Sequence, residues 1–282
     1  MDSQRFHLAE PYFLTSLKYK DEAIPETLSS LLNSIGVSFK EQGKYKEAKK
    51  YYIDSIDLQK TYVKEVSYSS VRTLAMSNMN LGVLYTDSGE FDKGLLFLEE
   101  ALRLFRGFPE ESNEFFDQLA SCLNNIGNHY ASQENYDSNK LISCLEEALK
   151  LRRRIVDEEN IPYSFRLANI LGNLALAYCK EKQFEIAEIM LKEAVARHVA
   201  YESIGIFSYR PTHISMLLNA AAFYTDFLEN KTAALTLAKR ALQLLIISNP
   251  VDIIKRRNMM RIKSIYDAFN EELPLYENQL EA

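Results

Sequence analysis

The sequence of 282 residues has little of what sheets and disulfide scaffolds require. It contains 9 glycines, 7 prolines and no tryptophan, which is too little turn-forming material for an all-β protein of this length. Its three cysteines, Cys122, Cys144 and Cys179, form no CxxC pair, and their odd number argues against a disulfide framework. We therefore expect a cytoplasmic protein whose reduced cysteines pack as small apolar side chains.

The charge balance and the hydropathy exclude two further classes of protein. The net charge is -6 and the isoelectric point about 5.4, so nothing attracts the chain generally to nucleic acid or to an anionic membrane. No apolar run reaches the ~18 residues that a membrane-spanning helix needs. Two basic segments, 152–154 and 255–263, are local exceptions, and we interpret the first as a helix end, where cations complement the macrodipole, with a docking site as the alternative. We therefore expect neither a nucleic-acid partner nor membrane insertion.

Motifs of common catalytic and metal sites are missing as well. The sequence has no P-loop, no GxGxxG, no HExxH and no GxSxG. The four histidines, His7, His129, His198 and His213, fall in different repeat units of the chain. Carboxylates are numerous, but pairs such as Glu99-Glu100 fall on faces that we expect to be solvated. We therefore predict a protein that is not an enzyme and that has no metal site and no cofactor.

What the sequence does have is a repeated segment. Five copies are LLNSIGVSF (31–39), MNLGVLY (79–85), CLNNIGNHY (122–130), LGNLALAY (171–178) and LLNAAAFY (217–224). The small residue in each copy is Gly36, Gly82, Gly127, Ala175 and Ala221, so that successive copies are 45 to 48 residues apart. A fixed period in this range is typical of a solenoid of stacked helical units.

A turn and a second apolar stripe follow most copies. In the first unit the stripe is Tyr45, Ala48, Tyr52 and Ser55, with the i, i+3, i+7, i+10 spacing of one helix face. Each unit is thus predicted to be an antiparallel helix pair. We place the pairs at 26–66, 67–110, 112–159, 162–205 and 211–249, a C-terminal capping helix at 251–272 and a tail at 273–282.

The N-terminal segment 1–20 leaves two alternatives open. Its residues Phe6, Ala9, Phe13 and Ser16 reproduce the second stripe without a first helix before it. The segment is therefore either an N-terminal capping helix or a half repeat. In the second case the chain is a fragment of a longer array.

The pattern resembles the tetratricopeptide repeat (TPR) family. Matching positions include Ile35, Gly36, Phe39, Ala48 and Tyr52 in the first unit. No copy has the family's tryptophan, and the period exceeds the usual length of about 34 residues. The long period and the Asn-Leu-Gly core are similar to those of kinesin light chains and of bacterial Rap-type peptide receptors. The resemblance implies an all-α, right-handed α-solenoid of about five helix pairs with a terminal half repeat and a C-terminal capping helix.

An asparagine stands two residues before the small residue in four consecutive units, as Asn80, Asn125, Asn173 and Asn219. By helical periodicity these side chains point away from the second helix, toward the inner surface where solenoids bind. An amide has donors and an acceptor that can pair with peptide backbone, and the resemblance implies that contact for these four positions. The alternative is that each amide bonds to the next first helix along the array. The other residues predicted to line the groove are Asn33, Asn128, Asn169, Met76 and Met79.

We therefore predict a non-catalytic scaffold or adaptor that holds an extended peptide or protein segment in a concave groove. A peptide-responsive regulator and a structural segment of a larger protein are the alternatives. An acidic C-terminal peptide is not expected, because lysine and arginine are missing from the inner positions at which repeat proteins that grip a C-terminal carboxylate carry them. Those positions are Ser30, Asn33, Val37, Met76 and Asn80. The sequence leaves the partner and the oligomeric state open.

Overall fold

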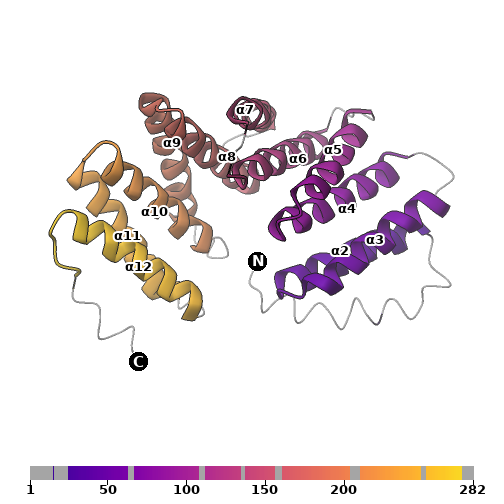
Figure 1. The fold of residues 1–282 in the computed structure, drawn as a ribbon, viewed down its shortest axis with the longest axis horizontal. Helices are drawn as coiled ribbons and strands as arrows, with labels where there is room; N and C mark the ends of the chain where they lie inside the picture. Colours follow the sequence, from indigo (N-terminus) through magenta and orange to yellow (C-terminus); the bar gives the residue numbers. More distant parts are fainter. Residues whose placement is uncertain are drawn as a thin grey trace. The chain divides into compact units, whose positions relative to one another are not determined.

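The computed structural model describes residues 15, 25–62, 67–107, 112–134, 137–155, 161–203, 210–248 and 252–274. Within these ranges the chain forms eleven helices and no strand, so the predicted all-α fold is confirmed (Figure 1). The helices are α2 (Pro25–Glu41), α3 (Tyr45–Tyr62), α4 (Tyr68–Asp87), α5 (Phe91–Gly107), α6 (Asn113–Ala131), α7 (Ser138–Ile155), α8 (Ile161–Lys180), α9 (Phe184–Ser203), α10 (Arg210–Asp226), α11 (Lys231–Ser248) and α12 (Asp252–Ala268). Apart from residue 15, the half repeat predicted at 1–20 lies outside the described residues.

The helices pack in antiparallel pairs within two compact units. Unit 1 lies within Met1–Val156 and contains the pairs α2/α3, α4/α5 and α6/α7. Unit 2 lies within Asp157–Ala282 and contains α8/α9, α10/α11 and the single helix α12. We call the first helix of each pair the A helix and the second the B helix. Inside each unit an A helix also contacts the next A helix, as α4 contacts α2 and α6, and α10 contacts α8 and α12.

The repeated small residue lies where the two helices of a pair come closest. A Cβ atom added to Gly82 of α4 would lie 2.8 Å from Leu98 Cγ and 2.9 Å from the carbonyl oxygen of Gly94, both on α5. At Gly127 the same atom would lie 2.7 Å from a methyl carbon of Leu145. These positions leave no room for a side chain, because real Cβ atoms do not approach neighbours so closely.

The turns from A helix to B helix share one hydrogen bond. A backbone N–H after the helix donates to a carbonyl five residues earlier, which is the pattern of a helix ended by a left-handed residue. The bonds are Lys44 to Phe39, Glu90 to Tyr85 and Gln183 to Tyr178, each 2.9 Å. The residue before each donor has positive φ, and these residues are Gly43 (74°), Gly89 (76°) and Lys182 (59°). After α10 the turn is one residue longer, since Asn230 donates to Tyr224 six residues earlier.

The C-terminal helix α12 has the features of an A helix. It packs on α10 and α11 as α10 packs on α8 and α9. The N–H of Glu271 donates to the carbonyl of Tyr266 over 3.1 Å, and Asn270 before it has a φ of 52°. The helix predicted as a cap at 251–272 thus takes the position of an A helix on α10 and α11, with the exposed Lys263 where the other A helices have the small residue, and its exposed stripe continues that of α10.

Exchanging the turn residues should change stability in opposite directions. Gly89→Ala is expected to lower the free energy of unfolding by about 1 kcal/mol, because alanine is strained at this φ although nothing lies within 4 Å of its Cβ. Lys182→Gly should raise it by up to about 1 kcal/mol, because it removes the same strain. Urea unfolding followed by circular dichroism measures both, with the exposed Gly107→Ala as control. A destabilised Lys182→Gly variant would contradict this account of the turns.

Candidate functional site

Each A helix keeps one stripe of side chains accessible, at spacings of three and four residues. We call these stripes the A-face, and we describe it separately for the two units. The unit 1 A-face consists of Ser30, Ser34, Val37, Arg72, Met76, Asn80, Val83, Glu114, Gln118, Asn125 and Asn128. The unit 2 A-face consists of Arg166, Asn169, Asn173, Leu176, Ser215, Asn219, Ala222, Asp226, Arg257, Arg261, Ser264 and Ala268. Both surfaces are rich in amides and small residues and carry few large apolar side chains.

The four asparagines at the repeated position all lie on these surfaces. Asn80 and Asn125 are half-buried on α4 and α6 of unit 1, and Asn173 and Asn219 are half-buried on α8 and α10 of unit 2. Each unit therefore presents two such half-buried amides, on adjacent A helices.

The remaining residues predicted for the groove differ in exposure. Asn128 is exposed, and Asn169 and Met76 are half-buried on the A-face. Asn33 and Met79 are buried, with 7% and 9% of their surfaces exposed. Met79 lies three residues before Gly82, on the side of α4 that packs into the core. Met79 was predicted to line the groove, but it is three residues after Met76 and therefore lies about 60° away from it around the helix axis, on the core side.

Asn80 and Asn219 bond to a neighbouring A helix or to α12 along the array. Asn80 Nδ2 donates to Asn33 Oδ1 over 3.0 Å, which joins α4 to α2. Arg261 Nη2 donates to Asn219 Oδ1 over 2.7 Å, which joins α12 to α10. The side chain of Asn125 forms no hydrogen bond with the part of the chain that the structure describes. The alternative considered from the sequence, that an amide bonds to the next first helix along the array, is therefore observed at Asn80 and Asn219.

The A-face of unit 2 contains a pocket of about 370 Å³ between α10 and α12. Its apolar lining comes from both helices, and Arg261 and Asp226 are its charged residues. The full lining is Leu218, Ala222, Thr225, Asp226, Met260, Arg261, Ser264, Ile265 and Ala268.

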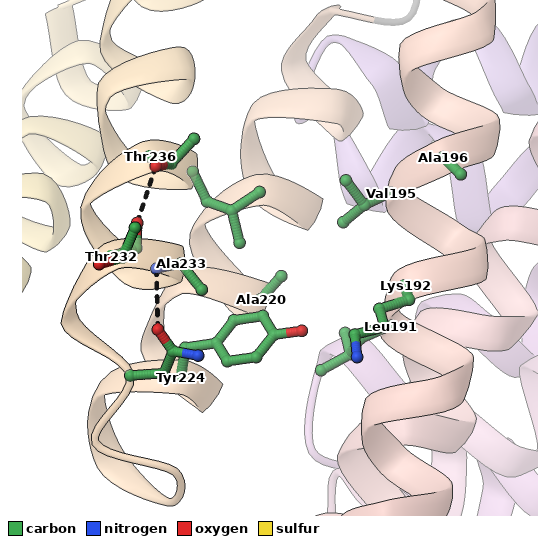
Figure 2. Close-up of a pocket in the computed structure, with 11 residues that line it drawn as sticks. Leu191, Lys192, Val195, Ala196, Ala220, Tyr224, Thr232, Ala233 and Thr236 are labelled. Atoms are coloured by element: carbon green, nitrogen blue, oxygen red, sulfur yellow. Dashed lines mark hydrogen bonds between the residues drawn. The ribbon is translucent and has the colours of Figure 1, made fainter.

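A larger pocket of about 570 Å³ lies on the other side of unit 2, between α9 and α11 (Figure 2). Ala220 and Tyr224 of α10 form its floor, and Leu191 and Val195 of α9 form one wall. Its polar groups are engaged locally, since Thr236 Oγ1 donates to the carbonyl of Thr232 over 2.7 Å. This pocket offers apolar contact area but few polar groups that could orient a ligand.

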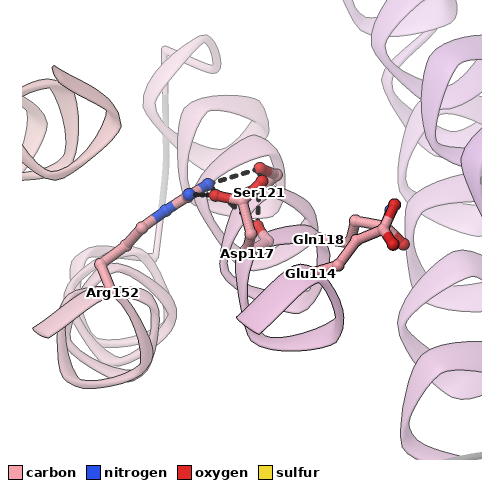
Figure 3. A network of polar contacts seen from close by, with 5 residues as sticks. All are labelled: Glu114, Asp117, Gln118, Ser121 and Arg152. Atoms are coloured by element: carbon pink, nitrogen blue, oxygen red, sulfur yellow. Dashed lines mark hydrogen bonds and ion pairs between the residues drawn. The ribbon is translucent and has the colours of Figure 1, made fainter. Parts of the chain in front are cut away.

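Unit 1 contains a buried ion pair that the sequence did not reveal. Arg152 of α7 forms an ion pair with Asp117 of α6, and the two residues are 2% and 5% exposed (Figure 3). Arg152 Nη2 also donates to Ser121 Oγ over 2.6 Å and to the carbonyl of Asp117 over 2.9 Å. Arg152 lies in the last turn of α7, as predicted, and its side chain is buried against α6. A buried guanidinium requires such a set of partners.

A pair of histidines is buried in unit 2. His198 of α9 stacks on His213 of α10 with ring centroids 5.1 Å apart, and Phe165 meets His198 edge-on. Burial, together with the neighbouring His213, lowers the pKa of His198 to about 4. The His198 ring is thus packed in the core as a neutral group at neutral pH.

The structure adds three observations on chemistry. Cys122 and Cys179 are buried free thiols, and burial raises the pKa of Cys122 to about 12, so that the reactive thiolate is scarce at neutral pH. Among the described residues no three His, Cys, Asp or Glu side chains are arranged to hold a metal ion. In the same ranges, no helix combines the length and the apolar character that crossing a bilayer demands.

Comparison with known proteins identifies the repeat. Two segments, residues 29–62 and 167–200, match models described as tetratricopeptide repeat. They correspond to most of α2/α3 and to parts of α8 and α9. No curated protein sequence matches the chain significantly.

Solved structures share the fold at low sequence identity. The apo form of the quorum sensor NprR from B. thuringiensis aligns over 98% of this chain and 68% of its own, with 15% identity and a TM-score of 0.65. A Rap protein complexed with Competence and Sporulation Factor aligns over 94% of this chain and 72% of its own, with 16% identity and a TM-score of 0.60. Kinesin light chain TPR-like repeats from Podosopora anserina align over 80% and 97%, with 15% identity and a TM-score of 0.57.

Stability should fall in acid because of His198. Its pKa is about 4 in the folded chain against an ordinary value of 6.5, so between these pH values only the unfolded chain binds the proton. The contribution is complete above pH 6.5 and is lost as the pH falls to about 4, by about 3 kcal/mol in total. Urea unfolding at pH 7, 6, 5 and 4 should show a shallower decline for His198→Gln than for the parent chain. Parallel curves would refute this assignment.

Breaking the buried ion pair should be costly. Arg152→Met is expected to lower the free energy of unfolding by about 3 to 5 kcal/mol, because it leaves the Asp117 carboxylate buried without its cation. The double variant Arg152→Met, Asp117→Leu should recover much of that loss. Arg153→Met, at the exposed neighbouring position, should cost less than about 0.5 kcal/mol. Equal losses at the two arginines, measured by urea unfolding, would contradict the buried pair.

Proposed function

From the premise that the chain is a tetratricopeptide-repeat protein, we propose that it is a protein-interaction module that holds an extended peptide or protein segment along its A-face. The proposal involves no catalytic step. Its support is the repeated asparagine, which appears half-buried and in register on adjacent A helices, twice in unit 1 and twice in unit 2. The Rap structure, a complex with Competence and Sporulation Factor, is a protein of this fold with a bound factor.

The spacing of the amides fits an extended ligand. Neighbouring A helices pack about 10 Å apart, while an extended chain advances ~3.3 Å per residue. Within one unit, Asn80 and Asn125 would therefore meet the ligand about three residues apart. Each amide can accept from a peptide N–H and donate to a peptide carbonyl, which reads the backbone and not the side chains.

The amides alone supply only part of the affinity. At a net ~0.5 to 1.5 kcal/mol per hydrogen bond, four of them provide a few kcal/mol, whereas micromolar binding needs about 8. Asn80 and Asn219 are also engaged with neighbouring A helices and would have to share or exchange these bonds. Apolar contacts must provide the remainder, and Met76, Val83 and Leu176 are accessible on the A-face for this purpose.

The links between A helices also favour a second candidate function, that of a peptide-responsive regulator. A ligand that takes over the bond from Asn80 to Asn33, or the bond from Arg261 to Asn219, would change how two A helices are held together. Binding and helix packing are then coupled by the difference between the two bonding arrangements. A change of amide hydrogen exchange in α2 or α12 on ligand binding would support this function.

Removing the amides should weaken binding without unfolding the chain. Peptides are first selected from a random twelve-residue display library on the full chain, and their affinities are measured by fluorescence polarisation. Asn125→Ala, Asn173→Ala is expected to weaken binding about tenfold to thirtyfold, because two backbone-reading side chains are lost. Asn139→Ala, at the exposed start of α7, serves as the control and should change nothing. If the double variant binds as the parent does while its circular dichroism is unchanged, the amide ladder does not bind the ligand.

A further inference from the structure

We propose that the pocket between α10 and α12 selects a ligand segment in which an acidic residue and a basic residue lie three positions apart with an apolar residue between them. The inference rests on the proposed function, since it assigns ligand chemistry to one end of the same surface. It is carried by the register of the two helices and by the charges at the two ends of the pocket.

The two helices present their A-face residues in a common register. Residues of α12 follow the equivalent residues of α10 by 42 positions, and Arg261 occupies the place that Asn219 has on α10. Further along the pocket, Ala222 has Ser264 as its equivalent, and Asp226 has Ala268. Helix α12 therefore carries arginine at the position of the repeated asparagine.

One end of the pocket carries uncompensated positive charge. Arg261 donates to the amide oxygen of Asn219, which is a neutral acceptor. Arg257, one turn earlier on the same face, is exposed and forms no ion pair with any residue that the structure describes. Burial and the nearby Arg257 both lower the pKa of Arg261, which shows that the two cations disfavour each other. A ligand carboxylate would relieve this repulsion and accept charge-assisted hydrogen bonds.

The other end is negative. Asp226 lines the pocket at the C-terminal end of α10, is exposed, and has no cation paired with it within the described ranges. A ligand cation is the complement of this carboxylate, and an anion placed there would be repelled. The pocket thus has a polarity along its length, with Arg261 at one end and Asp226 at the other.

The distance between the two ends sets the spacing of the ligand charges. Seven residues separate Asn219, the partner of Arg261, from Asp226, and at 1.5 Å per residue they span about 10 Å. An extended ligand segment that lies along α10 and α12, and not across the A helices as at the repeated amides, covers that length in about three residues. Ala222 and Ile265 line the pocket between the charged ends, and Leu218 and Met260 add apolar lining beside Arg261, so that its 370 Å³ has room for an apolar side chain. The acidic residue can come before or after the basic residue along the ligand chain.

This chemistry differs from that of an acidic C-terminal peptide. The absence of lysine and arginine from the A-face positions of α2 excludes a cationic clamp on that helix. The arginines lie instead on α12, where they bind an acidic residue within the ligand chain. The nearby Asp226 favours a basic residue close to that acidic residue.

The test is a peptide selection from the same random twelve-residue display library on the full chain and on the variant Arg257→Gln, Arg261→Gln. On the parent chain, peptides with an acid and a base three positions apart should be enriched at least threefold over the starting library. On the variant, that enrichment should disappear. Lys263→Gln, which changes an exposed cation of α12 outside the pocket, should select as the parent does.

Fluorescence polarisation with one selected peptide then tests each end separately. Changing the acidic residue of the peptide to glutamine should weaken binding to the parent about tenfold. The same change should weaken binding to Arg261→Gln less than twofold. Arg261→Lys should keep part of the preference for the acidic peptide. Changing the peptide base to glutamine should weaken binding to the parent but not to Asp226→Asn, an exposed position whose substitution does not threaten the fold.

The outcomes separate this inference from the proposed function. If the selected peptides lack the charge spacing and bind the parent and the Arg257→Gln, Arg261→Gln variant equally well, the inference is wrong. The A-face would still be a peptide-binding surface. A selection that yields no peptide at all would overturn both.

Discussion

The close approach of the two helices in each pair is the constraint on which the rest of the structure depends. Gly82 and Gly94 face each other so closely that a Cβ atom on Gly94 would lie 3.1 Å from the carbonyl oxygen of Gly82. This contact fixes the rotation of the A helix against its B helix, because only the side with the small residue can enter it. The A helix of each pair therefore leaves the same stripe uncovered. The residue two positions before the small one lies at the edge of that stripe.

The uncovered stripe then serves two purposes that compete for the same atoms. Amides at Asn80 and Asn219 hold neighbouring A helices together, and the same amides are the groups best suited to bind a peptide backbone. Since a hydrogen bond between partly exposed groups contributes little net free energy, exchanging one for a bond to ligand is inexpensive. This makes the A-face a surface whose internal contacts are comparable in strength to the contacts it would make with a partner.

Polar groups that serve neither purpose are buried between helices. The ion pair of Arg152 with Asp117 lies within unit 1, and the stacked rings of His198 and His213 lie within unit 2. An all-apolar interface would pack a helix pair at least as stably, whereas a buried charge tolerates only an arrangement in which its partner is in place. The arginine in the last turn of α7 is thus tied to α6 and does not simply complement the helix dipole.

The sequence by itself determined the helical fold, the five pairs and the stripe that carries Asn80, Asn125, Asn173 and Asn219, because these follow from helical periodicity and from the size of one repeated residue. Only the tertiary structure decided which side chains meet across helices. The partners of Asn80, Arg152 and Arg261 lie 47, 35 and 42 residues away. These bonds depend on how far individual side chains extend between packed helices, which a local sequence pattern does not specify. The same holds for the burial of Met79.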